Sequence, residues 1–144
     1  MKKIIPIGAD HAGFELKAKV IDFLENNGYE VKDYGCYSTE SIDYADYGHQ
    51  VALHVEQNPD VFGIVICGSG NGINMTVNKH QGIRAALCWT PEIAKLAREH
   101  NDANILTLPA RFISEESALE MLQLFIDTPF EGGRHLNRIN KIPC

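Results

Sequence analysis

Two hydrophobic patterns alternate along the whole chain. Short apolar runs rich in β-formers are separated by longer segments in which apolar residues recur every three or four positions, the spacing of a helix. The run at residues 61–66 is apolar at nearly every position, which is typical of a central strand covered on both faces. The predicted strands are Lys3–Gly8, Tyr29–Asp33, Phe62–Cys67, Ile83–Cys88 and Asn104–Leu108.

The segments between these strands carry the start and stop signals of helices. Thr90 and Pro91 suit the N-cap and first turn of one, Ser114 opens another, and Gly28 is placed to end the first. Helices are predicted over residues 14–24, 44–55, from the glycines after Cys67 to Val77, 91–99 and 114–126, with weak helical period over 131–139. This order predicts an α/β fold, a Rossmann-like three-layer α/β/α sandwich around a five-strand parallel sheet.

Composition and charge narrow the class of protein. The chain has 144 residues, which predicts one domain over residues 1–144, and its net charge of −6 argues against nucleic acid as a partner. No stretch approaches the roughly 20 apolar residues that cross a membrane. The four cysteines form no C-x-x-C pair, so we interpret them as reduced thiols in a cytoplasmic protein.

Functional residues are expected directly after the strands, because ligands of parallel sheets bind outside the carboxyl ends of the strands. Asp10 and His11 follow the first strand and precede a helix. Asp is also a common N-cap and His a tolerated loop residue, so a structural role remains open for both.

The segment Cys67–Gly72, with glycine at three alternate positions, follows the third strand. Such a loop lets backbone N–H groups converge on an anion, helped by the helix N-terminus that follows. A dinucleotide fingerprint would need glycine where Ile73 stands, and the P-loop Gly-Lys-Ser/Thr is absent, so a nucleotide site is disfavoured.

Cys67 fits few of the known cysteine chemistries. A redox C-x-x-C pair fails at Gly70, and the phosphatase pattern of Cys, five residues and Arg fails at Ile73. Two interpretations remain: a buried structural cysteine, or a thiolate that acts as base or nucleophile. Neighbouring amides and the helix terminus are expected to lower the pKa of the thiol, which favours the second.

Further candidates lie late in the chain. His100 and Asn101 precede the fifth strand, and Arg134 and Arg138 are spaced to share a helical face that can hold a phosphate. His100 as a capping residue and the arginines as a solvated basic face remain the structural alternatives. The spacings of His49, His54 and His80 match no metal motif, so metal catalysis is not expected.

Together these residues comprise a thiol, an anion-stabilising loop, a carboxylate, histidines and an arginine pair. Without metal or nucleotide, that set suits proton transfer next to a carbonyl in a small phosphorylated substrate.

The sequence resembles the ribose/galactose isomerase family, and most closely its type B ribose-5-phosphate isomerases. The match covers essentially the whole chain. It rests on Gly8–Gly13, Asp43-Tyr44, Cys67–Gly72, Asn78-Lys79, Gly82–Ala85, His100–Asp102 and Glu131–His135.

The resemblance implies a metal-free, cofactor-free aldose–ketose isomerase that works through a cis-enediolate. Some members use a Glu later in the loop as base, but Ile73 stands there, so the base would be Cys67, with Ser69 beside it. His100, assisted by Asp10, would open the sugar ring. The amides from Gly68 to Gly72 would hold the enediolate, and the substrate would contact Gly68, Gly70, Asn71, Gly72, His11, Tyr44, Asn101, Arg111, Arg134 and Arg138.

The family assembles its site between subunits, so a homodimer or a dimer of dimers with shared active sites is implied. An isomerase of a hexose 6-phosphate of the allose or galactose type is the first alternative. A non-catalytic sugar-phosphate-binding module and a phosphatase are the others.

Overall fold

The computed structural model describes residues 3–144 and contains a five-stranded sheet in the order β2-β1-β3-β5-β4. All four strand pairs are parallel. The strands are β1 (Ile4–Ala9), β2 (Glu30–Asp33), β3 (Gly63–Cys67), β4 (Ala85–Leu87) and β5 (Ile105–Pro109). We call the side on which they end the carboxyl edge and the side on which they begin the amino edge.

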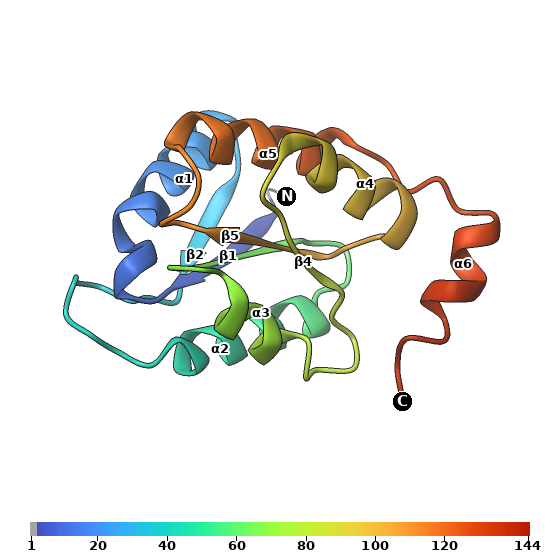
Figure 1. Ribbon diagram of the computed structural model, residues 1–144, viewed down its shortest axis with the longest axis horizontal. Helices are drawn as coiled ribbons and strands as arrows, with labels where there is room; N and C mark the ends of the chain where they lie inside the picture. The colour runs from blue at the N-terminus through green and yellow to red at the C-terminus, as the bar shows by residue number, and fades with distance from the viewer. Residues whose placement is uncertain (1–2) are drawn as a thin grey trace.

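Helices cover both faces of this sheet (Figure 1). On one face lie α1 (Phe14–Asn26), α4 (Pro91–Asn101) and α5 (Glu115–Asp127), and on the other lie α2 (Tyr44–Gln57) and α3 (Asn71–Val77). A 3₁₀ turn, η1 (His11–Gly13), precedes α1, and α6 (Arg134–Ile139) lies at the side of the molecule beyond α4. The predicted three-layer α/β/α sandwich is confirmed.

The element boundaries follow the sequence signals closely. Thr90 caps α4 by accepting a bond from the amide of Ile93, and Ser114 caps α5 in the same way through Ser117. The fourth strand is shorter than the predicted Ile83–Cys88. The amide of Ile83 donates to the carbonyl of His80 in a turn, so regular pairing begins at Ala85.

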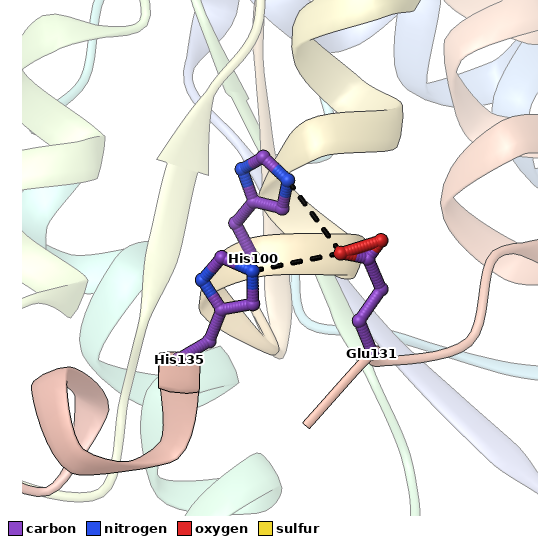
Figure 2. Close-up of side chains that lie close together, drawn as sticks. All are labelled: His100, Glu131 and His135. Atoms are coloured by element: carbon purple, nitrogen blue, oxygen red, sulfur yellow. Dashed lines mark ion pairs between the residues drawn. The ribbon is translucent and has the colours of Figure 1, made fainter. Parts of the chain in front are cut away.

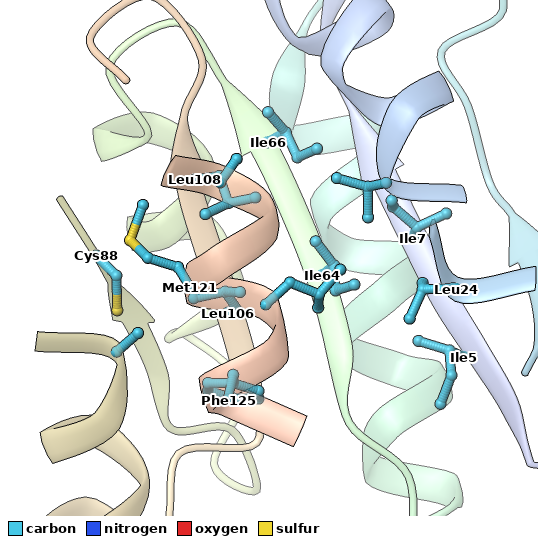
Figure 3. Packing of buried hydrophobic residues seen from close by; sticks show 14 of the residues in the cluster. Ile5, Ile7, Leu24, Ile64, Ile66, Cys88, Leu106, Leu108, Met121 and Phe125 are labelled. Atoms are coloured by element: carbon cyan, nitrogen blue, oxygen red, sulfur yellow. The ribbon is translucent and has the colours of Figure 1, made fainter. Parts of the chain in front are cut away.

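Two apolar cores stabilise the layers. The larger lies between the sheet and α1, α4 and α5, and includes Ile5, Ile64, Leu106 and Phe125 (Figure 3). The smaller lies under α2 and α3 around Val65. The central strands β3 and β5 are buried at every position, as the continuous apolar run predicts.

A buried lysine fixes the chain beside the end of β1. The Lys17 side chain is 3% exposed, and its Nζ donates to Asp33 Oδ1 and to the carbonyl of Cys36, both at 2.6 Å. The amide of Cys36 in turn donates to the carbonyl of Ala9. These bonds hold the segment after β2 against the strand that leads into Asp10.

Among the described residues, no helix combines the length and the apolar character that a membrane crossing requires.

Candidate active site

Two adjacent strands bring Asp10 and Cys67 together at the carboxyl edge. Ala9 of β1 pairs with Ile66 of β3, and the amide of Asp10 donates to the carbonyl of Ile66 at 3.1 Å. Asp10 is 7% exposed, and its Oδ1 accepts bonds from the amides of Ala12 and Gly13. Asp10 therefore caps η1, which is the structural role that the sequence left open. Both capping bonds end on Oδ1.

Cys67 is the last residue of β3 and is 4% exposed. Burial raises the pKa of its thiol, and the charge of Asp10 raises it further, whereas the backbone of Ile73, Gly70 and Gly72 lowers it. The expectation of a lowered pKa is wrong in direction. The loop amides act as expected, but the loss of water around the sulfur outweighs them.

The glycine loop depends on the absence of side chains. Gly70, the N-cap of α3, has φ +78°, and a Cβ there would overlap Leu87. A Cβ on Gly72 would overlap the ring of Tyr44, which therefore lies against the loop. The Oγ of Ser69 accepts a bond from the amide of Asn71 at 3.2 Å and keeps the turn closed.

Two further candidates flank this loop. The amide of Arg111 donates to the carbonyl of Gly68 at 3.0 Å, and a Cβ on Gly68 would lie 3.3 Å from the Arg111 guanidinium. His11 lies in η1, where its Nδ1 accepts a bond from the amide of Ile42. We call the group at the carboxyl edge the thiol half: Asp10, His11, Tyr44, Cys67, Gly68, Ser69, Gly70, Asn71, Gly72 and Arg111.

The remaining candidates lie at the amino edge. Because α4 joins the parallel strands β4 and β5, it runs back across the sheet and ends where β5 begins. The Arg84 side chain, just before β4, donates to the carbonyls of Asn101 and Asp102 and fixes this helix end. Cys67 instead pairs with Pro109, the last residue of β5. Within one chain, His100 and Asn101 are thus separated from Cys67 by the length of β5.

His100 lies in the last turn of α4, with Asp102 at the C-cap, so it is not itself the cap. Its ring stacks on that of His135, with centroids 4.4 Å apart and planes inclined by 16°. Glu131 Oε1 lies beside the two rings, 3.7 Å from His100 Nε2 and 3.5 Å from His135 Nε2 (Figure 2). The side chains of His100 and Glu131 are 39% and 46% exposed, whereas that of His135 is 7% exposed.

The arginine pair lies close to this cluster. Arg134 and Arg138 are both in α6, as their spacing predicts, and both are exposed. Neither makes an ion pair with another described residue. We call His100, Asn101, Arg134 and Arg138 the histidine half.

A model of the family described as Ribose/Galactose Isomerase matches residues 5–142. The chain belongs to this isomerase family. It is 43% identical over 142 residues to ribose-5-phosphate isomerase B of Escherichia coli, an alignment that covers 99% of this chain and 95% of that protein.

Solved structures agree with this membership of the ribose/galactose isomerases. A ribose 5-phosphate isomerase from Thermotoga maritima superposes with a TM-score of 0.94 at 51% identity and covers 97% of each chain. Ribose-5-phosphate isomerase B from Mycoplasma genitalium, solved with bound ribulose-5-phosphate, superposes with a TM-score of 0.95 at 38% identity and covers 99% of this chain and 95% of that one.

Sequence reasoning missed two members of the His100 cluster in this ribose/galactose isomerase. Glu131 and His135 were visible only as parts of a family motif, and no helical spacing links either to His100. Their proximity depends on how the tail docks: the amide of Glu131 donates to the carbonyl of Glu99 in the last turn of α4. Only tertiary structure supplies that contact.

The other histidines of this isomerase make pairs of their own. His80 lies in a loop, and its Nε2 is 2.8 Å from His49 Nδ1 while its Nδ1 is 3.1 Å from Glu56 Oε1. His54 Nδ1 bonds to the hydroxyl of Tyr34. None of these side chains touches the thiol half or the histidine half in these contacts.

A cavity of about 400 Å³ lies at the amino edge, between Phe62, Arg84 and Asn104. It contains no residue of either half.

Proposed function

We propose that this chain is an aldose–ketose isomerase that interconverts ribose 5-phosphate and ribulose 5-phosphate through a cis-enediolate, and that residues 1–144 act as one catalytic domain. The observation that carries the proposal is the buried thiol of Cys67 beside Asp10 and the glycine loop, in a chain 43% identical to ribose-5-phosphate isomerase B of Escherichia coli. The product of the same reaction is bound in the Mycoplasma genitalium structure, a protein of the same fold.

Cys67 is the base of the isomerisation. As thiolate it takes the proton from C2 of the open-chain aldose, the electron pair moves into a C1–C2 double bond, and the carbonyl oxygen at C1 becomes an enediolate oxygen. The proton of the C2 hydroxyl moves to the C1 oxygen. Return of the first proton to C1 then leaves the carbonyl at C2, gives the ketose and restores the thiolate, so no other reactant is needed. The backbone groups of Gly70 and Gly72 lower the pKa of the thiol and so favour the thiolate against its burial.

The loop amides from Gly68 to Gly72, with Asn71 among them, stabilise the charge that develops on the enediolate oxygens. In other enzymes, loss of a single oxyanion donor costs about 2.7–4 kcal/mol of transition-state stabilisation, so several donors account for a large part of the rate. Ser69 follows Cys67 by two residues and holds the loop closed by accepting a bond from the amide of Asn71.

Ring opening precedes the isomerisation, because ribose 5-phosphate is mainly a furanose. His100 moves the proton between the ring oxygen and the anomeric hydroxyl. Asp10 assists: both of its capping bonds end on Oδ1, so Oδ2 remains available for a substrate hydroxyl. Tyr44 and Asn101 shape the space for the sugar.

The active site is shared between subunits of a homodimer or a dimer of dimers. Within one chain the thiol half and the histidine half lie at opposite edges, about 16 Å apart along the length of β5. A sugar phosphate cannot contact both across the intervening sheet, whereas the thiol half of one subunit and the histidine half of another can enclose it. His11 and Arg111 then bind the phosphate from one side, and Arg134 and Arg138 from the other.

On this proposal the enzyme works in the cytoplasm, where cysteines stay reduced. All four cysteines are unpaired in this structure. A reduced Cys67 is a requirement of the mechanism, because a disulfide has no thiolate.

An isomerisation assay with the purified protein tests the proposal. Ribose 5-phosphate, allose 6-phosphate and galactose 6-phosphate are each incubated with the enzyme in D₂O, and aldose, ketose, deuterium content and inorganic phosphate are measured. We expect ribulose 5-phosphate to form faster than either hexulose phosphate. Preferential conversion of a hexose phosphate would show that the substrate is a hexose phosphate and not ribose 5-phosphate. Unchanged sugars without deuterium would indicate a binding module, and released phosphate would indicate a phosphatase.

A further inference from the structure

The stacked histidines and Glu131 form a group of metal-ligand type. His100, Glu131 and His135 each offer one ligand atom, and these atoms all lie within 4.8 Å of one another. We propose that these three residues bind a divalent transition-metal ion of the zinc type, and that the bound ion inhibits the enzyme by occupying His100. The inhibition rests on the role proposed above for His100, whereas the binding of the ion does not.

The distances fit a tetrahedral ion. Zinc bonds of about 2.0–2.2 Å to nitrogen and oxygen place neighbouring ligand atoms about 3.4 Å apart in a tetrahedron. Glu131 Oε1 lies 3.5 Å from His135 Nε2 and 3.7 Å from His100 Nε2. Contraction by a few tenths of an ångström would bring these two edges to the coordination distance.

A second observation is independent of the clustering. His135 Nε2 is buried and has no hydrogen-bond partner, the only such side-chain atom among the described residues. Buried polar atoms in native proteins are nearly always satisfied, so an exception indicates a missing partner. The atom is directed toward Glu131, and the imidazole side chain is 7% exposed (Figure 2).

The stacking of the two rings defines what must move. With planes inclined by only 16°, a point close to both Nε2 atoms lies off the ring planes, whereas an imidazole lone pair lies within its plane. The half-exposed His100 and Glu131 side chains have room to turn, while the buried His135 is held in place. Binding therefore keeps His135 fixed and rotates His100 out of the stack.

The donor set selects the type of ion. Two imidazoles and one carboxylate suit zinc and its neighbours cobalt, nickel and copper, whereas magnesium and calcium prefer oxygen ligands. Three protein ligands leave a fourth position open to water or to a substrate oxygen. This arrangement is that of an accessible, exchangeable ion rather than of a closed structural site.

A metal ion bound to His100 would stop its acid–base function, because the ion occupies the lone pair of the imidazole nitrogen. A nitrogen that is bonded to a metal ion cannot accept or return a proton, so His100 loses its acid–base function while the ion is bound. Proton transfer by Cys67 on the open-chain sugar does not use this nitrogen. The ion should therefore slow conversion of the cyclic aldose more than deuterium exchange into open-chain ribulose 5-phosphate.

Direct binding of ZnCl₂ to the full-length protein tests the site without any assay of activity. Calorimetric titration is done with the unaltered chain, Glu131→Gln, His135→Gln and two control variants: His49→Gln, which alters the other histidine pair, and Cys67→Ser, which removes the buried thiol. We expect one ion per chain, at least about tenfold weaker binding for Glu131→Gln and His135→Gln, and unchanged binding for both controls.

The results of the titration and of the activity assay test metal binding and inhibition separately. Glu131 is exposed, so Glu131→Gln reports on the site even if His135→Gln fails to fold. Absence of binding to the unaltered chain, equal binding by Glu131→Gln, or loss of binding in Cys67→Ser would overturn the site. Binding that leaves conversion of ribose 5-phosphate unchanged would overturn the inhibition alone, and a protein without isomerase activity would still report on the site through the titration.

Discussion

At the scale of single residues, the surroundings of Cys67 decide its chemistry. The same feature that hides the thiol from water also raises its pKa, and Asp10 adds to the effect. A thiol with a raised pKa gives a more basic thiolate, which suits removal of a weakly acidic carbon-bound proton.

Replacement of the base should nearly abolish isomerisation. Cys67→Ala removes a small buried side chain, so the fold and phosphate binding should persist while the rate falls by about 10²–10⁴-fold, the usual contribution of a positioned base. The rate is followed by formation of ribulose 5-phosphate, and far-ultraviolet circular dichroism checks the fold. Retention of more than about a tenth of the rate would remove Cys67 from this role.

The pH dependence of alkylation should report the raised pKa. Only the thiolate reacts with iodoacetamide, so a raised pKa shifts the midpoint of the rate–pH profile of Cys67 upward, and the rate keeps rising where that of a free thiol, pKa about 8.5, has levelled off. Mass spectrometry of the modified peptides gives the rate for each cysteine. Bound ribulose 5-phosphate should protect Cys67 and leave the exposed Cys144 reactive. A midpoint below that of a free thiol would contradict the account.

Sequence alone selected the candidate site residues but did not predict all of their surroundings. Residue type and position after a strand pointed to Asp10 and Cys67, and the structure places both at the carboxyl edge. The predicted direction of the Cys67 pKa shift was wrong, because the burial of the thiol depends on the packing of the whole loop. The contact of His100 with His135 was invisible because it depends on tertiary docking.

At the scale of elements, the loop between β3 and α3 carries the strictest backbone demand of the site. Gly70 has φ +78°, and its Cα faces Leu87 and the chain at Leu108 and Pro109. An L-residue in that conformation costs about 1–2 kcal/mol. The loop is therefore held in one shape by β4 and β5, which keeps its amides directed at the sulfur of Cys67.

Gly70→Ala should lower both stability and activity. The left-handed backbone and the overlap with Leu87 together should reduce the free energy of unfolding by about 1–3 kcal/mol, as measured by urea titration. The rate should fall beyond the loss of folded protein, because the loop amides shift. Gly28→Ala is the matched control: Gly28 has φ +87° but open space around it, so it should lose stability and keep activity per folded molecule. Equal activity of the two variants would contradict the role of the loop.

The elements themselves were largely predictable, because apolar period and capping residues are local signals. Five strands and the helices that follow them appear where the sequence places them, with most boundaries shifted by a residue or two, while α6 begins three residues after the predicted start at 131. The position of α6 was not predictable. Its few apolar residues do not specify which surface it contacts. The backbone bond between Glu131 and Glu99 and the stacking of His135 on His100 show that it docks beside α4.

At the scale of the whole molecule, the direction of α4 has the largest functional consequence. Because this helix returns to the amino edge, one chain presents the thiol half and the histidine half on opposite edges of its sheet. A parallel α/β fold requires this separation, whatever the side chains are. We propose a shared active site because it would let both halves act on one small substrate.

Complementation between two inactive variants tests this central claim most directly. Cys67→Ala damages the thiol half and Arg134→Ala the histidine half, so a heterodimer would contain one site built from two undamaged halves. After subunit exchange of an equal mixture, half of the dimers are mixed, and we expect about a quarter of the unaltered specific activity. The control pairs His100→Asn with Arg134→Ala, which damage the same half and should regain nothing. Absence of recovery in the first mixture, with mixed dimers confirmed by native mass spectrometry, would contradict the shared site.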